Sequence, residues 1–173
     1  TSLLTRALET TQHILAGSDQ QWIPVHKSWR LNERHYGGLQ GLNKDDARKK
    51  WGEDQVHQWR RSYDVRPPRE SEEQREAYLK NRRYQHIDHR MMPYCESLKD
   101  TLERVVPFWT DHISQHLLDD KTVLVSAHGN SIRALIKYLE GLSEEDIVGY
   151  EIKTGAPLVY ELTDDLVVKD KYY

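Results

Sequence analysis

The sequence predicts an α/β domain of three layers, in which helices flank a mostly parallel central sheet. The nearly continuous apolar run at residues 121–126 is typical of a strand buried on both faces of a parallel sheet. A three-residue turn follows, and apolar residues then recur at helical spacing from 130 to 140. Strand, short turn and helix in this order are the signature of an α/β fold.

The first residues predict a helix and then a short strand. Ser2 is expected to cap the helix and Gly17 to end it, because the apolar residues between them share one face. The β-prone segment 22–25 predicts a strand, and Pro24 within it favours the edge of a sheet.

A long loop and two short helices are expected next. Residues 26–41 show no period and hold three glycines, and a loop of that length in a compact domain is usually functional. Asn43 is expected to cap a helix that ends at Gly52, and a second short helix should cover 54–61.

Residues 65–95 predict an irregular flap, because they hold three prolines and many charges with little apolar periodicity. A helix near 71–80 is expected within it. The alternative is a disordered surface insertion, for which low hydrophobicity is the compositional mark.

The last third predicts two helices and a hairpin. Apolar residues at helical spacing predict a helix over 96–118, which Pro107 should kink. A short helix should begin after Ser143. Segments 157–162 and 166–169 are expected to pair as a terminal hairpin.

Length and composition predict one cytoplasmic domain over residues 1–173. A chain of 173 residues with 37% apolar residues can bury a core, and no stretch approaches the roughly 20 apolar residues of a membrane span. The net charge of −3 argues against nucleic acid as a partner. The lone cysteine, Cys95, and the lack of a signal-like leader favour a reducing compartment.

His128 is the strongest candidate for chemistry. It follows the carboxyl end of the predicted strand, where open α/β sheets place ligands. Gly129 and Asn130 begin the next helix, whose free N–H groups favour an anion, so His128 is placed to meet a phosphate. The alternative is a histidine that only caps or packs at a strand end.

Glu33 and several cations form the second group of candidates. Arg34 and His35 beside Glu33 would set its pKa for proton transfer, unless the three only form surface ion pairs. Adjacent Arg60 and Arg61 point in different directions on a helix and suit a small anion, although a solvated charged face is the alternative. Lys44 and Arg6 offer further cations with similar alternatives. The histidines do not match a zinc pattern, so no metal is predicted.

Three long segments of the sequence resemble, in the same order, the motifs of a known family. Residues 31–37, 59–64 and 126–131 resemble the cofactor-dependent phosphoglycerate mutases of the histidine phosphatase superfamily. Nearly the whole chain is similar to that family, most weakly over 69–92. The resemblance implies a phosphoglycerate mutase-like α/β fold.

The resemblance also implies roles for residues that match the family's motifs. His128 would contact the transferring phosphoryl group, Glu33 would move the substrate hydroxyl proton, and Arg6 would line the phosphoryl pocket. The positions that match substrate-binding or site-bracing residues of the family are Arg34, His35, Tyr36, Lys44, Arg60, Arg61, Gly129 and Asn130.

The implied reaction interconverts 3-phosphoglycerate and 2-phosphoglycerate through a phosphohistidine, primed by 2,3-bisphosphoglycerate and without metal. It makes physical sense, because phosphoryl transfer needs positioning and charge neutralisation above all. Members commonly form homodimers or tetramers. Bisphosphoglycerate mutase, a phosphatase of the same superfamily, or an inactive anion-binding fragment are the alternatives.

One departure from the family is large. Members carry their nucleophilic histidine in an Arg-His-Gly motif at the end of a first central strand, and this sequence holds neither. The expectation is therefore that the chain as written does not turn over phosphoglycerate, because covalent catalysis requires its nucleophile.

Overall fold

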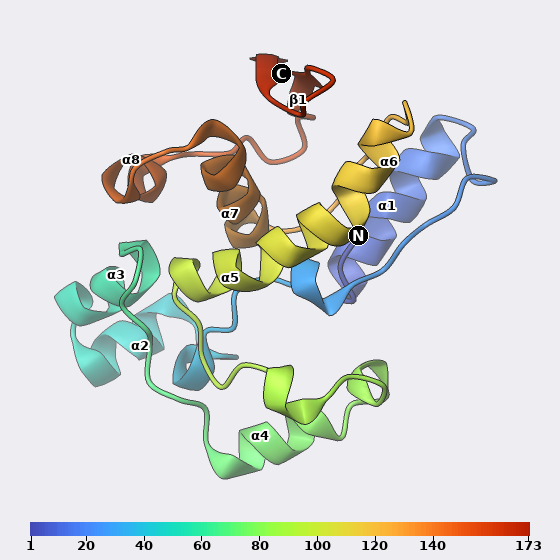
Figure 1. The fold of residues 1–173 in the computed structure, drawn as a ribbon. Coiled ribbons are helices and arrows are strands. Elements are labelled where there is room, and N and C mark those ends of the chain that lie inside the picture. The colour runs from blue at the N-terminus through green and yellow to red at the C-terminus, as the bar shows by residue number, and fades with distance from the viewer. The chain divides into compact units, whose positions relative to one another are not determined.

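The computed structural model describes all residues, 1–173, and they form two compact units. The first unit combines residues 1–33 with 102–173, and the second unit is the continuous segment 34–101. Figure 1 shows the elements of both units along the chain. The single domain over 1–173 stays a prediction.

The first unit is mostly helical. Its elements are α1 (Thr5–Gly17), the end of α5 (Leu98–Phe108), a π-helical turn (Trp109–Ile113), α6 (Ser114–Leu118), α7 (Gly129–Glu140), α8 (Glu144–Gly149), β1 (Val159–Leu162) and β2 (Val168–Tyr172). Its buried apolar side chains come from α1, the turn at 29–31, α5, the π-helical turn, α7 and α8.

The first helix begins later than the sequence predicts. Helix α1 starts at Thr5 and its N-cap position, Leu4, offers no side-chain cap, so the prediction that Ser2 caps it is wrong. The Ser2 hydroxyl instead accepts a bond from the N–H of Leu4 and contacts His128. The end at Gly17 is confirmed.

The predicted helix over 96–118 is present but interrupted. Pro107 lies in the last turn of α5, and the five-residue π-helical turn follows at once before α6 resumes the α-helical pattern. Proline has no N–H and its ring crowds the preceding turn, so the regular hydrogen-bond pattern cannot continue through it. Figure 1 shows the three pieces following one another as a single yellow rod.

Neither strand predicted for the central sheet forms a ladder. Residues 22 and 23 lie in a turn and a bend, residues 24 and 25 have no regular structure, and Trp22 is 79% exposed. Residues 121–126 are neither paired nor buried on both faces, and Leu124 is 50% exposed. A strand needs a neighbouring strand for its backbone groups, and the sheet of these 173 residues contains only β1 and β2.

The C-terminal hairpin is confirmed, although both strands begin two residues later than predicted and β2 ends three residues later. Strands β1 and β2 pair antiparallel, with a bulge between Glu161 and Leu162. Glu140, the last residue of α7, accepts bonds from the Tyr160 hydroxyl and from the Lys171 ammonium, so it ties the hairpin to that helix. Glycine at 141 adopts the left-handed conformation that ends α7.

The second unit contains three helices, α2 (Lys44–Trp51), α3 (Glu53–Arg61) and α4 (Glu72–Leu79), together with the start of α5. As predicted, the Asn43 side chain caps α2 by accepting the N–H of Asp46 at 2.8 Å. The small core of α2 and α3 consists of Leu39, Ala47 and Val56, with Tyr36, Trp51 and Trp59 packed against it.

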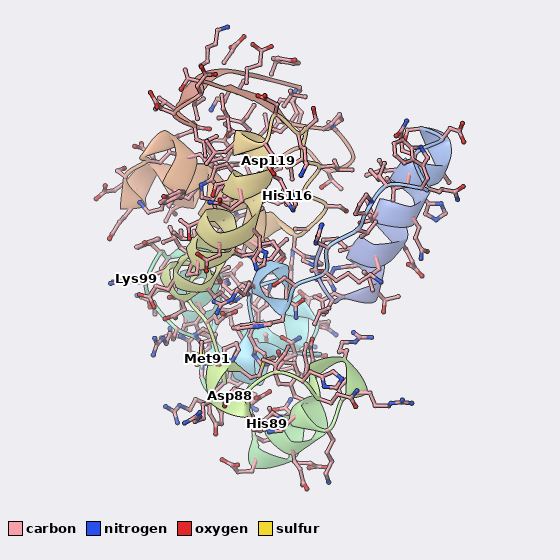
Figure 2. The ribbon with its side chains drawn as sticks, turned by 45° about the vertical axis from the view of Figure 1, so that its right-hand side comes forward. Asp88, His89, Met91, Lys99, His116 and Asp119 are labelled. Carbon is pink, nitrogen blue, oxygen red and sulfur yellow. The ribbon has the colours of Figure 1, made fainter.

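The flap holds the predicted helix. Ser71 forms a capping box with Gln74 at the start of α4. Buried Arg75 then donates to Glu70 and to the carbonyls of residues 89, 92 and 93, which fixes the path of the segment after the helix. Figure 2 labels Asp88, His89 and Met91 on that segment.

Gly37 should tolerate no side chain. Its φ is +55°, and an added Cβ would lie 2.1 Å from the carbonyl oxygen of Pro68 and 2.7 Å from the Cβ of Cys95. We expect Gly37→Ala to lower the free energy of unfolding by roughly 1–3 kcal/mol through backbone strain and overlap. Denaturant unfolding measures this. Gly17→Ala, where an added Cβ meets nothing within 4 Å, is the control, and equal stability of both variants would contradict the prediction.

Candidate functional site

An open pocket of about 260 Å³ lies in the first unit. It is lined by Arg6, Ala7, Thr10, Glu33, Ala127, His128 and Gly129. Three predicted site residues from distant parts of the chain, Arg6, Glu33 and His128, therefore meet here. The fourth, Gly129, supplies the first residue of α7.

His128 lies at the N-cap of α7, where the extended segment turns into the helix. The hydroxyl of Ser131 accepts the N–H of His128 at 3.2 Å and lies 3.1 Å from its carbonyl, so this turn is held from both sides. The imidazole Nε2 lies 2.7 Å from the hydroxyl of fully buried Ser2. The ring is thus fixed in place at the pocket, with only 6% of the residue exposed.

The surroundings of His128 keep its imidazole neutral. Burial lowers the pKa of His128 to about 4, the positive charges of Arg6 and Arg104 act in the same direction, and the Glu33 carboxylate opposes them. A neutral imidazole at neutral pH can donate one N–H to an anion without adding a charge to the pocket.

Glu33 is held at the start of α7. Its Oε1 accepts the backbone N–H of Asn130 at 3.2 Å. The first N–H groups of a helix lack partners within the helix and attract negative charge, so a carboxylate is stabilised there. A phosphate would be stabilised for the same reason. The arrangement places a carboxylate, an imidazole and a guanidinium around one anion-sized space.

Two residues that the sequence analysis did not assign to the site support this pocket. Arg104 donates to the carbonyls of the loop that carries Glu33, and Ser2 contacts the His128 ring. A signal for Arg104 was available, because Ser97, Thr101 and Arg104 follow one another on one face of the predicted helix, and all three are buried. The sequence analysis selected Ser2 only as a helix cap, and its pattern gives no signal for a contact with His128.

A second pocket, of about 200 Å³, lies in the second unit. It is lined by Lys44, Arg48, Glu53, Val56, His57, Arg60 and Arg61. The structure thus brings together three predicted cations from α2 and α3, and it adds Arg48 and His57, which the sequence analysis did not select. Arg48 is also within 3.7 Å of the Glu53 carboxylate.

Two guanidinium groups lie over the Tyr36 ring. The Arg34 group lies 4.5 Å and the Arg60 group 5.1 Å from the centre of its ring. Arg34 also donates to the carbonyl of Arg60 at 3.3 Å and is only 2% exposed. Arg34 is therefore placed to brace the loop against α3. Neither Arg34 nor Tyr36 lines the second pocket.

His35 likewise makes its contacts within the second unit. Its Nδ1 accepts the N–H of Gly37 at 3.0 Å, so the ring proton of a neutral imidazole lies on Nε2, 3.2 Å from the Glu70 carboxylate. The backbone N–H of His35 donates to Glu96 at 2.8 Å. Burial raises the pKa of Glu70, while Arg75 opposes the shift. These contacts indicate that His35 braces the flap.

No group of three or more histidine, cysteine, aspartate or glutamate side chains is arranged to hold a metal ion. None of the helices combines the length and the apolar character that crossing a bilayer requires.

The pKa of His128 predicts how stability depends on pH. The imidazole titrates near 6.5 in the unfolded chain and at about 4 in the folded one. Between these values only the unfolded chain binds the proton, so the free energy of unfolding should fall as the pH is lowered from 6.5 to 4. Urea unfolding of the chain and of His128→Gln across this range measures the effect. The variant should lose less stability, and identical pH profiles would contradict the assignment.

Comparison with known proteins identifies the family. The sequence profile of the histidine phosphatase superfamily (branch 1) matches residues 1–79 and 67–172. The 2,3-bisphosphoglycerate-dependent phosphoglycerate mutase of Staphylococcus epidermidis (strain RP62A) is 99% identical over the whole chain, which covers 76% of that protein. The enzyme of the same name from Staphylococcus aureus (strain JH9) is 82% identical over the same share.

A solved structure shows the same fold. Bacillus stearothermophilus YhfR superposes with a TM-score of 0.62 over 96% of this chain and 68% of its own, at 18% identity. The predicted α/β, phosphoglycerate mutase-like class is therefore confirmed, although β1 and β2 form the sheet that this chain itself contains. Since the superfamily profile covers almost every residue, the chain belongs to the histidine phosphatase superfamily (branch 1).

Proposed function

We propose that the protein interconverts 3-phosphoglycerate and 2-phosphoglycerate by phosphoryl transfer through a phosphohistidine that these 173 residues do not supply. The observation that carries the proposal is the pocket at the start of α7, where Arg6, Glu33 and His128 meet. The names of the 99% and 82% identical relatives support it.

Each residue of this pocket has a role in the proposal. Arg6 neutralises charge on the transferring phosphoryl group, and neutral His128 donates an N–H to its oxygens. Glu33, a half-buried carboxylate at the same pocket, takes the proton from the attacking substrate hydroxyl and returns it to the leaving oxygen. Gly129 supplies a backbone N–H group at the start of α7, while the N–H of Asn130 holds the Glu33 carboxylate beside it.

The names of the relatives support 2,3-bisphosphoglycerate as the primer. Both pockets suit phosphate, since one adjoins a helix N-terminus beside Arg6 and the other gathers Lys44, Arg60 and Arg61. The primer supplies the phosphoryl group that charges the enzyme. Lys44, Arg60 and Arg61 bind the anionic substrate, while Arg34, His35 and Tyr36 brace the loop that follows Glu33.

The direct test is a mutase assay on the chain completed with the flanking residues of its Staphylococcus epidermidis relative. We expect conversion of 3-phosphoglycerate to 2-phosphoglycerate that depends on added 2,3-bisphosphoglycerate. Synthesis and hydrolysis of 2,3-bisphosphoglycerate are measured in parallel. Hydrolysis or synthesis that exceeds mutase turnover would assign the chain to one of the alternative activities instead.

Arg60 and Arg61 should bind substrate more than they stabilise the fold. In the completed protein, Arg60→Ala or Arg61→Ala should lower kcat/KM by more than about tenfold, or about 1.4 kcal/mol, because each removes a donor to an anion. Arg82→Ala, at an exposed position outside both pockets, is the matched control. Unchanged kinetics in both variants would favour a solvated charged face.

We also propose that the enzyme is cytoplasmic and forms homodimers or tetramers. The single cysteine of the chain supports a reducing compartment, and the resemblance to the family supports the assembly. Sedimentation equilibrium of the completed protein tests the assembly, and a monomer at micromolar concentration would contradict it.

A further inference from the structure

Arg104, on α5, is a buried cation bound to one loop. The residue is 6% exposed, and its Nη1 donates to the carbonyl of Arg30 at 2.6 Å. Its Nη2 donates to the carbonyls of Asn32 and Glu33 at 3.0 and 3.2 Å. A planar guanidinium that binds successive carbonyls fixes the path of a backbone in a way that a lysine ammonium cannot.

The loop bound by Arg104 has little regular structure of its own. Residues 26–33 contain one short turn, Trp29–Leu31, and make no strand ladder. Asn32 adds a second anchor, because its side chain accepts the N–H of Leu3 at 2.9 Å. The position of the Glu33 backbone therefore depends on the Arg104 side chain from α5 and on the backbone at the start of the chain. That position decides whether the carboxylate reaches Asn130 and the pocket.

The charge of Arg104 also acts on the pocket. The ionisable groups that act on His128 are Arg6, Glu33 and Arg104, and both arginines favour the neutral imidazole. A lysine at position 104 would keep this charge and lose the planar set of donors, whereas a methionine would lose both. The two substitutions therefore separate the effect of geometry from the effect of charge.

We infer that Arg104 is a positioning residue, whose guanidinium holds the loop that carries Glu33 against the start of α7 without touching the substrate. The inference rests on the proposed function, in which Glu33 transfers the hydroxyl proton. Misplacing a reacting group by about 1 Å can cost on the order of 100-fold in rate, so a loosened loop should lower kcat.

The experiment compares Arg104→Lys and Arg104→Met in the completed protein. We expect kcat to fall at least about tenfold in both, while KM for 3-phosphoglycerate stays within about threefold, because the substrate cations are unchanged. Lys27→Met, which removes an exposed cation from the same loop, is the matched control and should keep its activity. The pKa of His128, followed by NMR, should rise in Arg104→Met and stay low in Arg104→Lys.

Hydrogen exchange provides a test that is independent of activity. The amides of Leu31 and Asn32, which bond to Ser28 and Trp29, should exchange at least tenfold faster in Arg104→Lys. If these amides exchange in Arg104→Lys at the wild-type rate, the inference is overturned. An unchanged kcat in this variant would also overturn it. If Arg104→Met does not fold, Arg104→Lys still decides the question. A completed wild-type protein without mutase activity would instead refute the proposed function, while exchange would still test the role of Arg104.

Discussion

Glu33→Gln should abolish most of the mutase activity of the completed protein, with kcat about 10²- to 10⁴-fold lower. Glutamine has nearly the same shape, and its amide oxygen can still accept the N–H of Asn130, so the loop should keep its position. It cannot take up a proton from a substrate hydroxyl. KM should change little, because the cations of α2 and α3 that we propose to bind substrate are untouched.

The control for Glu33 is Glu9→Gln, which removes an exposed carboxylate from α1 in the same unit. Its kinetics should match those of the wild-type protein. If Glu33→Gln retains more than about a tenth of the wild-type kcat, Glu33 is not the acid/base and the ion-pair interpretation of the loop is favoured.

His128→Ala should lower kcat about 10²- to 10³-fold, which is typical of removing one preorganised donor to a developing oxyanion. The neutral imidazole, held by Ser2 and the α7 turn, offers such a donor at no cost of reorganisation during the reaction. The substitution should lower kcat and not only raise KM. Steady-state kinetics measures turnover of substrate, and intact mass measures formation of the acid-labile phosphohistidine.

The matched control for His128 is His13→Gln, on the exposed face of α1, which should leave both measurements unchanged. Phosphohistidine should also form more slowly in His128→Ala, because charging by 2,3-bisphosphoglycerate reverses the transfer to substrate and needs the same donor. Charging at the wild-type rate would contradict the donor role. A stable phosphoryl group found on His128 itself, in the wild-type protein, would show that His128 is the nucleophile.

Local signals in the sequence determined most of the helices. Asn43 and Ser71 cap α2 and α4, and Gly141 ends α7, because capping and left-handed turns depend on residues a few positions apart. Pro107 marked the interruption between α5 and α6 for the same reason. Segments 22–25 and 121–126 were predicted incorrectly as strands, since a ladder depends on a distant partner that a local pattern does not specify.

The sequence alone determined the chemical groups of this protein, namely a histidine at the start of a helix, a carboxylate in a long loop and adjacent arginines on α3. Only the tertiary structure decided which of them meet. It placed Arg6, Glu33 and His128 around one pocket and gave Arg104 and Ser2 their roles beside it. These contacts join residues up to 126 positions apart, and such pairings follow from burial and backbone path, not from spacing along the chain.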